Sequence, residues 1–270
     1  MALDRTSINR LGQIGPDEPV AAKVNYLYRI SDSSLPKERF EFATKRTCLA
    51  NFIDVFAPSH NELTIIADSV GDDTWKLVNL LHSNAIRTNF QSGAQSWRFA
   101  AFDVALAQFP DDVFVYFVED DYLHLPASAE ILREGLAISH YVSLYDHSDK
   151  YDSGALRNRN PYVVDGGELT RVVRTPSVHW KLTNSTTMTF AAKVATLRED
   201  AKIWEKHTRG PVPGDFPAFL ELARKGRSLI TPIPGSATHC EPAFASPGID
   251  WEEVARKSND AYATDQISTS

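Results

Sequence analysis

The sequence contains only two cysteines, Cys48 and Cys240, among its 270 residues. Neither stands in a Cys-x-x-Cys or Cys/His spacing, so the sequence indicates neither a disulfide framework nor a structural zinc site. We expect two free thiols, as in a protein of the reducing cytoplasm. No uninterrupted apolar stretch approaches the roughly 20 residues needed to cross a bilayer, and residues 1–15 lack the apolar segment of a signal peptide. We therefore expect a cytoplasmic protein with no membrane span.

Runs of basic residues are also missing. Lys and Arg number 28 against 35 Asp and Glu, which gives a formal charge of −7. This balance argues against a broad electrostatic contact with nucleic acid. Neither a GxxxxGK[ST] loop nor a GxGxxG fingerprint occurs, which excludes the P-loop and the commonest dinucleotide-binding signature.

What the chain does contain is enough apolar sequence for a sizeable core, at 43% of its residues. Short β-branched or aromatic runs alternate with longer amphipathic ones, a pattern typical of an α/β fold with a mixed central sheet flanked by helices. We expect one domain over residues 23–257. Residues 1–22 and 258–270 are polar and rich in small side chains, so we expect both ends to be loosely held.

Hydrophobic spacing predicts the elements in more detail. Expected strands cover residues 23–31, 62–70, 85–90, 113–118, 140–146 and 228–234, with short strands between 170 and 192. Expected helices start at Leu35-Pro36, Asp72, Ser96 (as N-cap) and Pro126, and further helices end at His207 and start at Asp215. Residues 149–168 form a polar loop with paired glycines and are a candidate lid.

The strongest chemical signal is three consecutive acids, Glu119, Asp120 and Asp121. They directly follow the run VFVYFV (residues 113–118), six apolar β-formers that read as a strand covered on both faces. Open α/β sheets bind ligands at the carboxyl ends of their strands. Adjacent carboxylates repel one another, and Mg²⁺ or Mn²⁺ relieves that repulsion while keeping positions for water and substrate phosphates. The alternative interpretation is a solvated acidic turn at the end of a strand.

The segment VYFVEDDYLHLP (residues 115–126) resembles the "DxD" signature of GT-A glycosyltransferases, in the EDD form of N-acetylglucosaminyltransferase I-type enzymes. With SLYDH, HWKLTNSTTMTFAAK and GRSLITPIPG, the chain is similar to small bacterial and phage-type members over roughly residues 23–245. The resemblance implies a GT-A fold and sugar transfer from a nucleotide diphosphate, with UDP-sugar as favoured donor, to a hydroxyl of a small molecule or glycan. It also implies an inverting reaction assisted by Mn²⁺ or Mg²⁺.

The resemblance further implies roles for individual residues. Asp121 would bind the metal, and Glu119 and Asp120 would orient the ribose and the donor sugar. Asp68, at the end of the second strand, would contact the nucleoside, although it is equally consistent with a helix N-cap. The remaining residues bordering this pocket, at the end of the first strand, would be Arg29, Ser31 and Asp32.

Two residues near the C-terminus complete the implied site. His239 would be a second metal ligand, since imidazole tolerates Mn²⁺, although a lone histidine is more often a hydrogen-bonded structural residue. Asp215 would be the general base, or else the cap of the helix that begins there. His124 we expect to be structural.

The segment from Trp180 to Thr186 has a composition suited to a sugar. Trp180 offers a ring for stacking, and Asn184 and Ser185 offer hydrogen bonds to an acceptor. Lys181 and Arg98, like Arg157 and Arg159, would neutralise the diphosphate. The same residues also match ordinary strand patterning and a solvated surface.

The sequence leaves three alternative functions open. A nucleotidyltransferase acting on a sugar phosphate would share the sheet, but the Gly-rich loop it needs is absent after the first strand. A lectin-like protein with a dead site would keep the fold without the intact acids. A phage-type enzyme acting on a modified DNA base is disfavoured by the charge, although a basic cleft of Arg157, Arg159, Arg171 and Arg174 would suffice for it. The sequence does not specify the oligomeric state.

Overall fold

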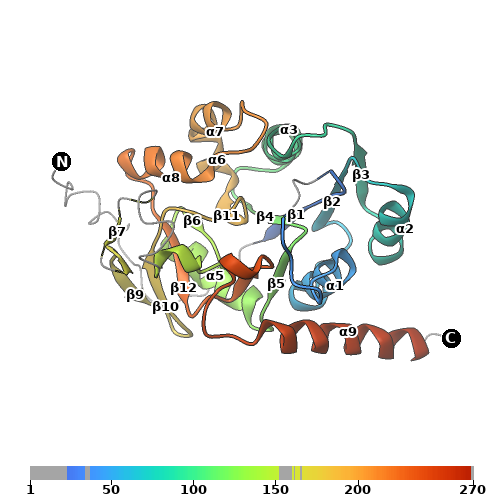
Figure 1. Ribbon diagram of the computed structural model, residues 1–270. Coiled ribbons are helices and arrows are strands. Elements are labelled where there is room, and N and C mark those ends of the chain that lie inside the picture. The colour runs from blue at the N-terminus through green and yellow to red at the C-terminus, as the bar shows by residue number, and fades with distance from the viewer. Residues whose placement is uncertain (1–22, 34–36, 152–159, 161, 165, 269–270) are drawn as a thin grey trace.

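The computed structural model describes residues 23–33, 37–151, 160, 162–164 and 166–268. A nine-stranded mixed sheet runs through their centre, in the order β3-β2-β1-β4-β11-β6-β12-β10-β9, with helices on both faces (Figure 1). Strands β3, β2, β1 and β4 are parallel, and β11 is antiparallel to its neighbours β4 and β6. The expected α/β architecture, a mixed central sheet flanked by helices, is confirmed.

The strands of the main sheet are β1 (Val24–Ser31), β2 (Leu63–Asp68), β3 (Ala85–Thr88), β4 (Phe114–Glu119), β6 (Tyr141–Val142), β9 (Val172–Arg174), β10 (His179–Leu182), β11 (Phe190–Lys193) and β12 (Leu229–Ile233). Two small ribbons pair β5 (Tyr122–His124) with β13 (Ala237–His239), and β7 (Val163–Val164) with β8 (Gly167–Glu168). The helices are α1 (Lys45–Phe56), α2 (Asp72–Leu81), α3 (Gly93–Arg98), the π-helix η2 (Phe99–Ala105), α4 (Leu106–Gln108), α5 (Ser128–Ile138), η3 (Ser148–Lys150), α6 (Val194–Glu199), α7 (Ala201–His207), α8 (Asp215–Arg224), η4 (Pro242–Phe244) and α9 (Trp251–Ser268).

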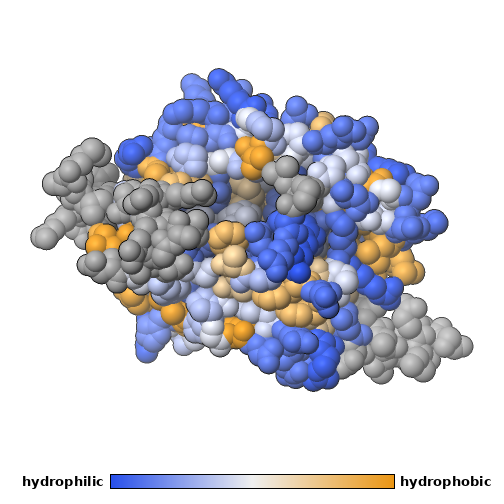
Figure 2. All heavy atoms as spheres, in the orientation of Figure 1, coloured by the Kyte–Doolittle hydropathy of each residue, from blue (hydrophilic) through white to orange (hydrophobic). Residues whose placement is uncertain are grey.

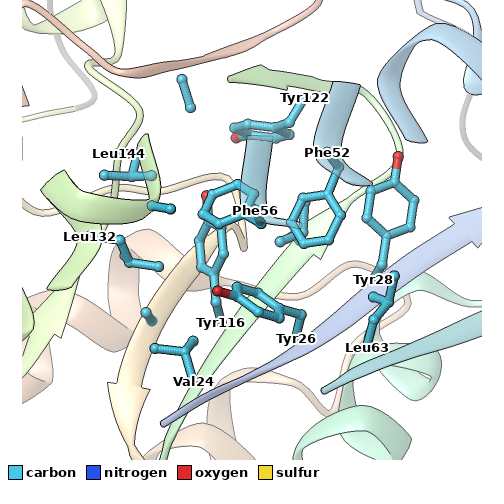
Figure 3. Close-up of a cluster of buried hydrophobic side chains, with 14 of the residues drawn as sticks. Val24, Tyr26, Tyr28, Phe52, Phe56, Leu63, Tyr116, Tyr122, Leu132 and Leu144 are labelled. Carbon is cyan, nitrogen blue, oxygen red and sulfur yellow. The ribbon is translucent and has the colours of Figure 1, made fainter. Parts of the chain in front are cut away.

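Alternating side chains of the central strands build a separate core on each face of the sheet. Tyr26, Tyr28 and Tyr116 point to one face, where they pack against Phe52 and Phe56 of α1 (Figure 3). The intervening residues of β1 and β4 point to the other face, among the aromatic side chains of η2, α3, α7 and α8. Because successive side chains of a strand point to opposite faces, both faces of these strands are buried against helices.

Several expected boundaries are wrong. Helix α1 begins at Lys45, where the Thr44 side chain caps it, whereas Leu35 and Pro36 lie outside the described residues. Ser96 is not an N-cap, because α3 begins at Gly93 and Ser92 accepts the capping hydrogen bond from the Gln95 N–H.

Two expected strands are also shorter than predicted. Of residues 140–146 only Tyr141–Val142 form a strand. The last of the short strands expected between residues 170 and 192 starts only at Phe190, because Thr187 and Met188 have positive φ angles of 48° and 63° and turn the chain before it.

At the ends of the chain, residues 1–22 lie outside the described residues, and α9 continues to Ser268, through most of the tail expected to be loosely held. No helix in the described ranges has both the length and the apolarity for crossing a bilayer.

The two cysteines lie together in a small apolar cluster with Leu123 and Trp251, and both are free and fully buried. Hydrogen bonding to Cys240, together with burial, raises the pKa of the Cys48 thiol well above its usual range. The thiolate is the reactive form of cysteine. We therefore expect the native protein to expose no reactive thiol to Ellman's reagent over minutes, and two after denaturation. Fast native labelling of either cysteine contradicts this packing.

Candidate functional site

The three acids lie at the carboxyl end of β4, in a cleft of about 360 Å³. Parallel strands β1 and β4 end side by side here, with Arg29 opposite Glu119 in the register. Strongly hydrophilic residues gather near the middle of this face, around the ends of β1 and β5 (Figure 2). The position is the one expected for a ligand site in an open α/β sheet.

Each acid is paired with a basic side chain. Glu119 accepts two hydrogen bonds from Arg29, at 2.6 and 3.0 Å. Burial raises the pKa of Glu119, and the Arg29 charge opposes that rise. Asp120 contacts the Lys45 ammonium at 2.7 Å and accepts a hydrogen bond from the Ser31 N–H at 3.2 Å. The repulsion expected among the three carboxylates is therefore offset by the chain's own cations.

Asp121 and His239 converge at the base of the cleft. Their Oδ2 and Nε2 atoms are 3.2 Å apart, and each side chain is only 4% exposed. The ribbon of β5 and β13 fixes this approach: His239 is in register with Tyr122, and the Cys240 N–H donates to the Asp121 carbonyl at 2.8 Å. Burial alone would raise the pKa of Asp121, but His239 and the two nearby side-chain cations hold it well below its usual range.

Lys37 and Arg39 supply those cations. The Lys37 Nζ lies 2.5 Å from the Asp121 Oδ2 and 2.9 Å from the His239 Nε2. Arg39 lies 3.4 Å from the same carboxylate oxygen and 3.5 Å from Asp120. Sequence analysis missed these two residues and Lys45. Their signal was present in KERFEFATKR (residues 37–46), where four basic residues follow the first strand.

The pair Asp121 and His239 fits a divalent cation. Adjacent ligands of an octahedral Mg²⁺ or Mn²⁺ stand about 3 Å apart, close to the observed 3.2 Å. Across the described parts of the chain no group of three or more His, Cys, Asp or Glu side chains is placed to hold a metal. Asp121 and His239 would be two protein ligands, in keeping with the few that Mg²⁺ takes beside substrate phosphates.

A second, open hollow of about 910 Å³ adjoins the cleft at the ends of β2 and β3. Ser33 and Gln91 line both spaces. Asp32 lines the hollow and binds the start of α2, accepting from the Gly71 N–H at 2.8 Å and the Thr74 hydroxyl at 3.0 Å. Most of its lining side chains are polar and can donate or accept hydrogen bonds.

Asp68 does not cap α2, and it does not line the space expected to hold the nucleoside. It is 1% exposed and lines neither space, and the residue that caps α2 is Gly71. Its Oδ1 accepts hydrogen bonds from the Thr88 hydroxyl at 3.0 Å and the Phe90 N–H at 2.7 Å. Asp68 thus shapes the wall of the hollow by holding the segment after β3.

Asp215 lines the same cleft as the acids, at the first position of α8. It does not cap its own helix, whose N-cap is Gly214. Instead its Oδ2 accepts from the Thr186 and Thr187 N–H groups, each at 2.7 Å, and from the Thr186 hydroxyl at 3.2 Å. Its Oδ1 accepts no hydrogen bond within the described residues. One carboxylate oxygen anchors a turn, and the other is available to a ligand.

The remaining expected site residues do not line the cleft or the hollow. Trp180 is fully buried, and a Cβ on Gly135 would lie 2.6 Å from its ring, so no ring face is open to a sugar. Lys181 is paired with Asp146 at 2.9 Å and is 2% exposed. These corrections have one cause: β10 is an interior strand of the sheet, between β12 and β9.

Three more residues are placed away from the acids. The Asn184 amide oxygen accepts from Lys150 and Asn160, and Ser185 is half-buried beside it. Arg98 donates to the Glu205 carbonyl at 3.2 Å, on the side of α7. Of the proposed basic cleft, Arg171 and Arg174 are exposed at the β9 edge of the sheet, and Arg157 and Arg159 lie outside the described residues. Much of the candidate lid, residues 149–168, also lies outside the described residues.

Comparisons with known proteins give structural matches alone. No protein-family model matches the sequence, and no curated protein does. A CMP:2-keto-3-deoxy-manno-octonic acid synthetase complexed with CTP matches at 14% identity and TM-score 0.46, over 90% of this chain and 100% of that one. Glucosyl-3-phosphoglycerate synthase from Mycobacterium tuberculosis, with Mg²⁺ and UDP, matches at 11% and 0.46, over 88% and 77%. A galactosyltransferase with donor and acceptor sugar analogs matches at 9% and 0.47, over 87% and 95%.

Proposed function

We propose that this chain is a glycosyltransferase that moves a sugar from a nucleotide-diphosphate sugar, with UDP-sugar as favoured donor, to a hydroxyl acceptor with inversion. The observation that carries the proposal is the convergence of Asp121 and His239 with three side-chain cations in one cleft, beside a polar hollow that we assign to the nucleoside. Mn²⁺ or Mg²⁺ is the cofactor that suits Asp121 and His239.

The charge of the cleft supports an anionic donor that binds together with a divalent cation. Four acidic side chains (Glu119, Asp120, Asp121, Asp215) line the cleft with three cations (Arg29, Lys37, Arg39), and Lys45 pairs with Asp120 from beside it, so these fixed charges nearly cancel before His239 is counted. A divalent ion held by Asp121 and His239 neutralises the diphosphate further and stabilises the negative charge of the leaving group. Paired acids and bases of this kind orient a charged ligand without repelling it.

The chain's own residues suggest how donor and acceptor are arranged. The nucleoside occupies the hollow at the ends of β2 and β3, which leads past Ser33 and Gln91 to the acids. The acceptor hydroxyl enters beside Asp215, where Pro211 and Val212 line the cleft. The Asp215 Oδ1 takes the proton as the hydroxyl attacks the anomeric carbon from the face opposite the diphosphate.

A thermal-shift screen of nucleotide sugars, with and without Mn²⁺, tests this function. A ligand at 100 times its Kd stabilises the native state by about 2.7 kcal/mol, which for a chain of this size raises Tm by about 5–10 °C. We expect one nucleotide to give a shift that depends on Mn²⁺, and Asp121→Ala to remove the metal-dependent part. Asp73→Ala, at a fully exposed side chain on α2, is the matched control. No shift with any nucleotide sugar, or equal shifts in parent and Asp121→Ala, contradicts the proposal.

A further inference from the structure

We propose that Lys37 is a tethered counter-cation: its ammonium holds the metal position of Asp121 and His239 while no metal is bound, and leaves that position when a divalent cation enters. This inference rests on the proposed function, because it assigns Asp121 and His239 to a metal. It adds a residue that competes with the metal and couples metal binding to donor binding.

The geometry places the ammonium at the point that both ligands share. The Lys37 Nζ is 2.5 Å from the Asp121 Oδ2 and 2.9 Å from the His239 Nε2, which are themselves 3.2 Å apart. The next acid, Glu241, is farther away at 3.9 Å. A divalent ion bound by both ligands and the Lys37 ammonium cannot occupy this point together, because each would lie within bonding distance of the same two atoms.

Burial shows which partner can move. The Asp121 and His239 side chains are each 4% exposed and are held by the ribbon of β5 and β13, whereas the Lys37 side chain is 27% exposed. Lys37 carries its ammonium on a flexible four-carbon stem. It can therefore turn away without any change in the backbone of the two ligands.

The contacts of Lys37 with Asp121 and His239 stabilise the metal-free site and also weaken metal binding. A buried carboxylate that loses its partner is strongly destabilising, so Lys37 keeps the metal-free site in place. An incoming metal must break the Lys37 contacts, which lowers its apparent affinity. Once displaced, the ammonium lines the same cleft as the donor's expected diphosphate and is free to pair with it. Metal and nucleoside diphosphate should therefore bind more tightly together than alone, by thermodynamic linkage.

Mn²⁺ titration followed by electron paramagnetic resonance, with and without UDP, tests the inference without reference to turnover. We expect Lys37→Gln to bind Mn²⁺ roughly tenfold more tightly than the parent when UDP is absent, equivalent to about 1.4 kcal/mol. Lys37→Arg keeps the charge and should stay close to the parent. Lys76→Gln, an exposed lysine on α2, is the matched control. With UDP present, the advantage of Lys37→Gln should shrink or reverse, because the variant lacks the charge that meets the diphosphate.

The outcomes separate two failures. If the parent binds Mn²⁺ and Asp121→Ala does not, but Lys37→Gln binds it no more tightly than the parent, the counter-cation role is wrong and the metal site stands. If neither the parent nor any variant binds Mn²⁺, even with UDP present, both the metal site and the role of Lys37 are wrong. A UDP complex that forms without any Mn²⁺ and is lost in Lys37→Gln would show that Lys37 replaces the metal permanently, and would also overturn the exchange.

Discussion

Replacing Asp215 by asparagine is expected to lower the rate of sugar transfer by about 10²–10⁴-fold, the usual contribution of a general base. The amide cannot take the proton of the acceptor hydroxyl. It still offers one carbonyl oxygen to the Thr186 and Thr187 N–H groups that now bind the Asp215 Oδ2. Turnover should therefore fall while Tm and donor binding stay near the parent values, as measured by a transfer assay beside thermal unfolding.

Two further variants distinguish the role of Asp215 as a general base from its role in holding the turn at residues 186–188. Asp215→Ala removes the base and also the acceptor of three hydrogen bonds, so it should lose transfer and also lower Tm. Asp73→Asn, at an exposed position, should change neither. If Asp215→Asn turns over like the parent, Asp215 serves only to hold the turn at residues 186–188, and another group must take the proton.

A comparably large effect is expected on stability in acid. His124 is fully buried among the rings of Phe52, Phe56 and Tyr116, and this burial lowers its pKa from 6.5 to about 3. Below pH 6.5 the unfolded chain takes up a proton that the folded chain refuses. The stability linked to His124 is thus complete above pH 6.5 and is lost as the pH falls toward 3. At about 1.4 kcal/mol per pKa unit, the loss is on the order of 5 kcal/mol.

Denaturant unfolding at pH 7, 5.5 and 4.5 measures the part of this loss that falls above pH 4.5. His124→Gln should be less stable than the parent at pH 7, because it disturbs the core and the hydrogen bond to the Tyr116 hydroxyl, but it should lose less stability on acidification. His60→Gln, at an exposed position, should keep the parent's slope. Equal slopes in parent and His124→Gln would mean that His124 does not control the acid response.

The sequence predicted the fold and the place of the acids because both follow from local pattern. An unbroken apolar strand, residues 113–118, must be covered on both faces, and the polar residues after it must lie at the carboxyl edge of the sheet. Asp121, His239 and Asp215 are indeed brought to one cleft. The Asp121 and Asp215 variants above test the roles proposed for those two residues.

The sequence did not predict which side chains of the later strands face the cleft. Trp180 and Lys181 have a composition suited to a sugar site, but β10 lies inside the sheet and turns both into buried contacts. In a strand, the face of a side chain depends on register and strand order, which a single sequence does not specify. The cations Lys37, Arg39 and Lys45 were missed for a related reason, since the path of the chain after β1 decides where they point.

The pairing of β5 with β13 holds both proposed metal ligands in position. Asp121 and His239 stand 118 positions apart in the chain, but backbone hydrogen bonds on both sides of the ribbon tie them together, from Cys240 to Asp121 and from Leu125 to Ser236. The distance between Asp121 and His239 therefore depends on strand pairing. While β5 and β13 are paired, both ligands are in place, and when the strands separate, both ligands are lost. Loss of cation binding during gentle heating should thus be abrupt, and its midpoint would report the opening of this ribbon.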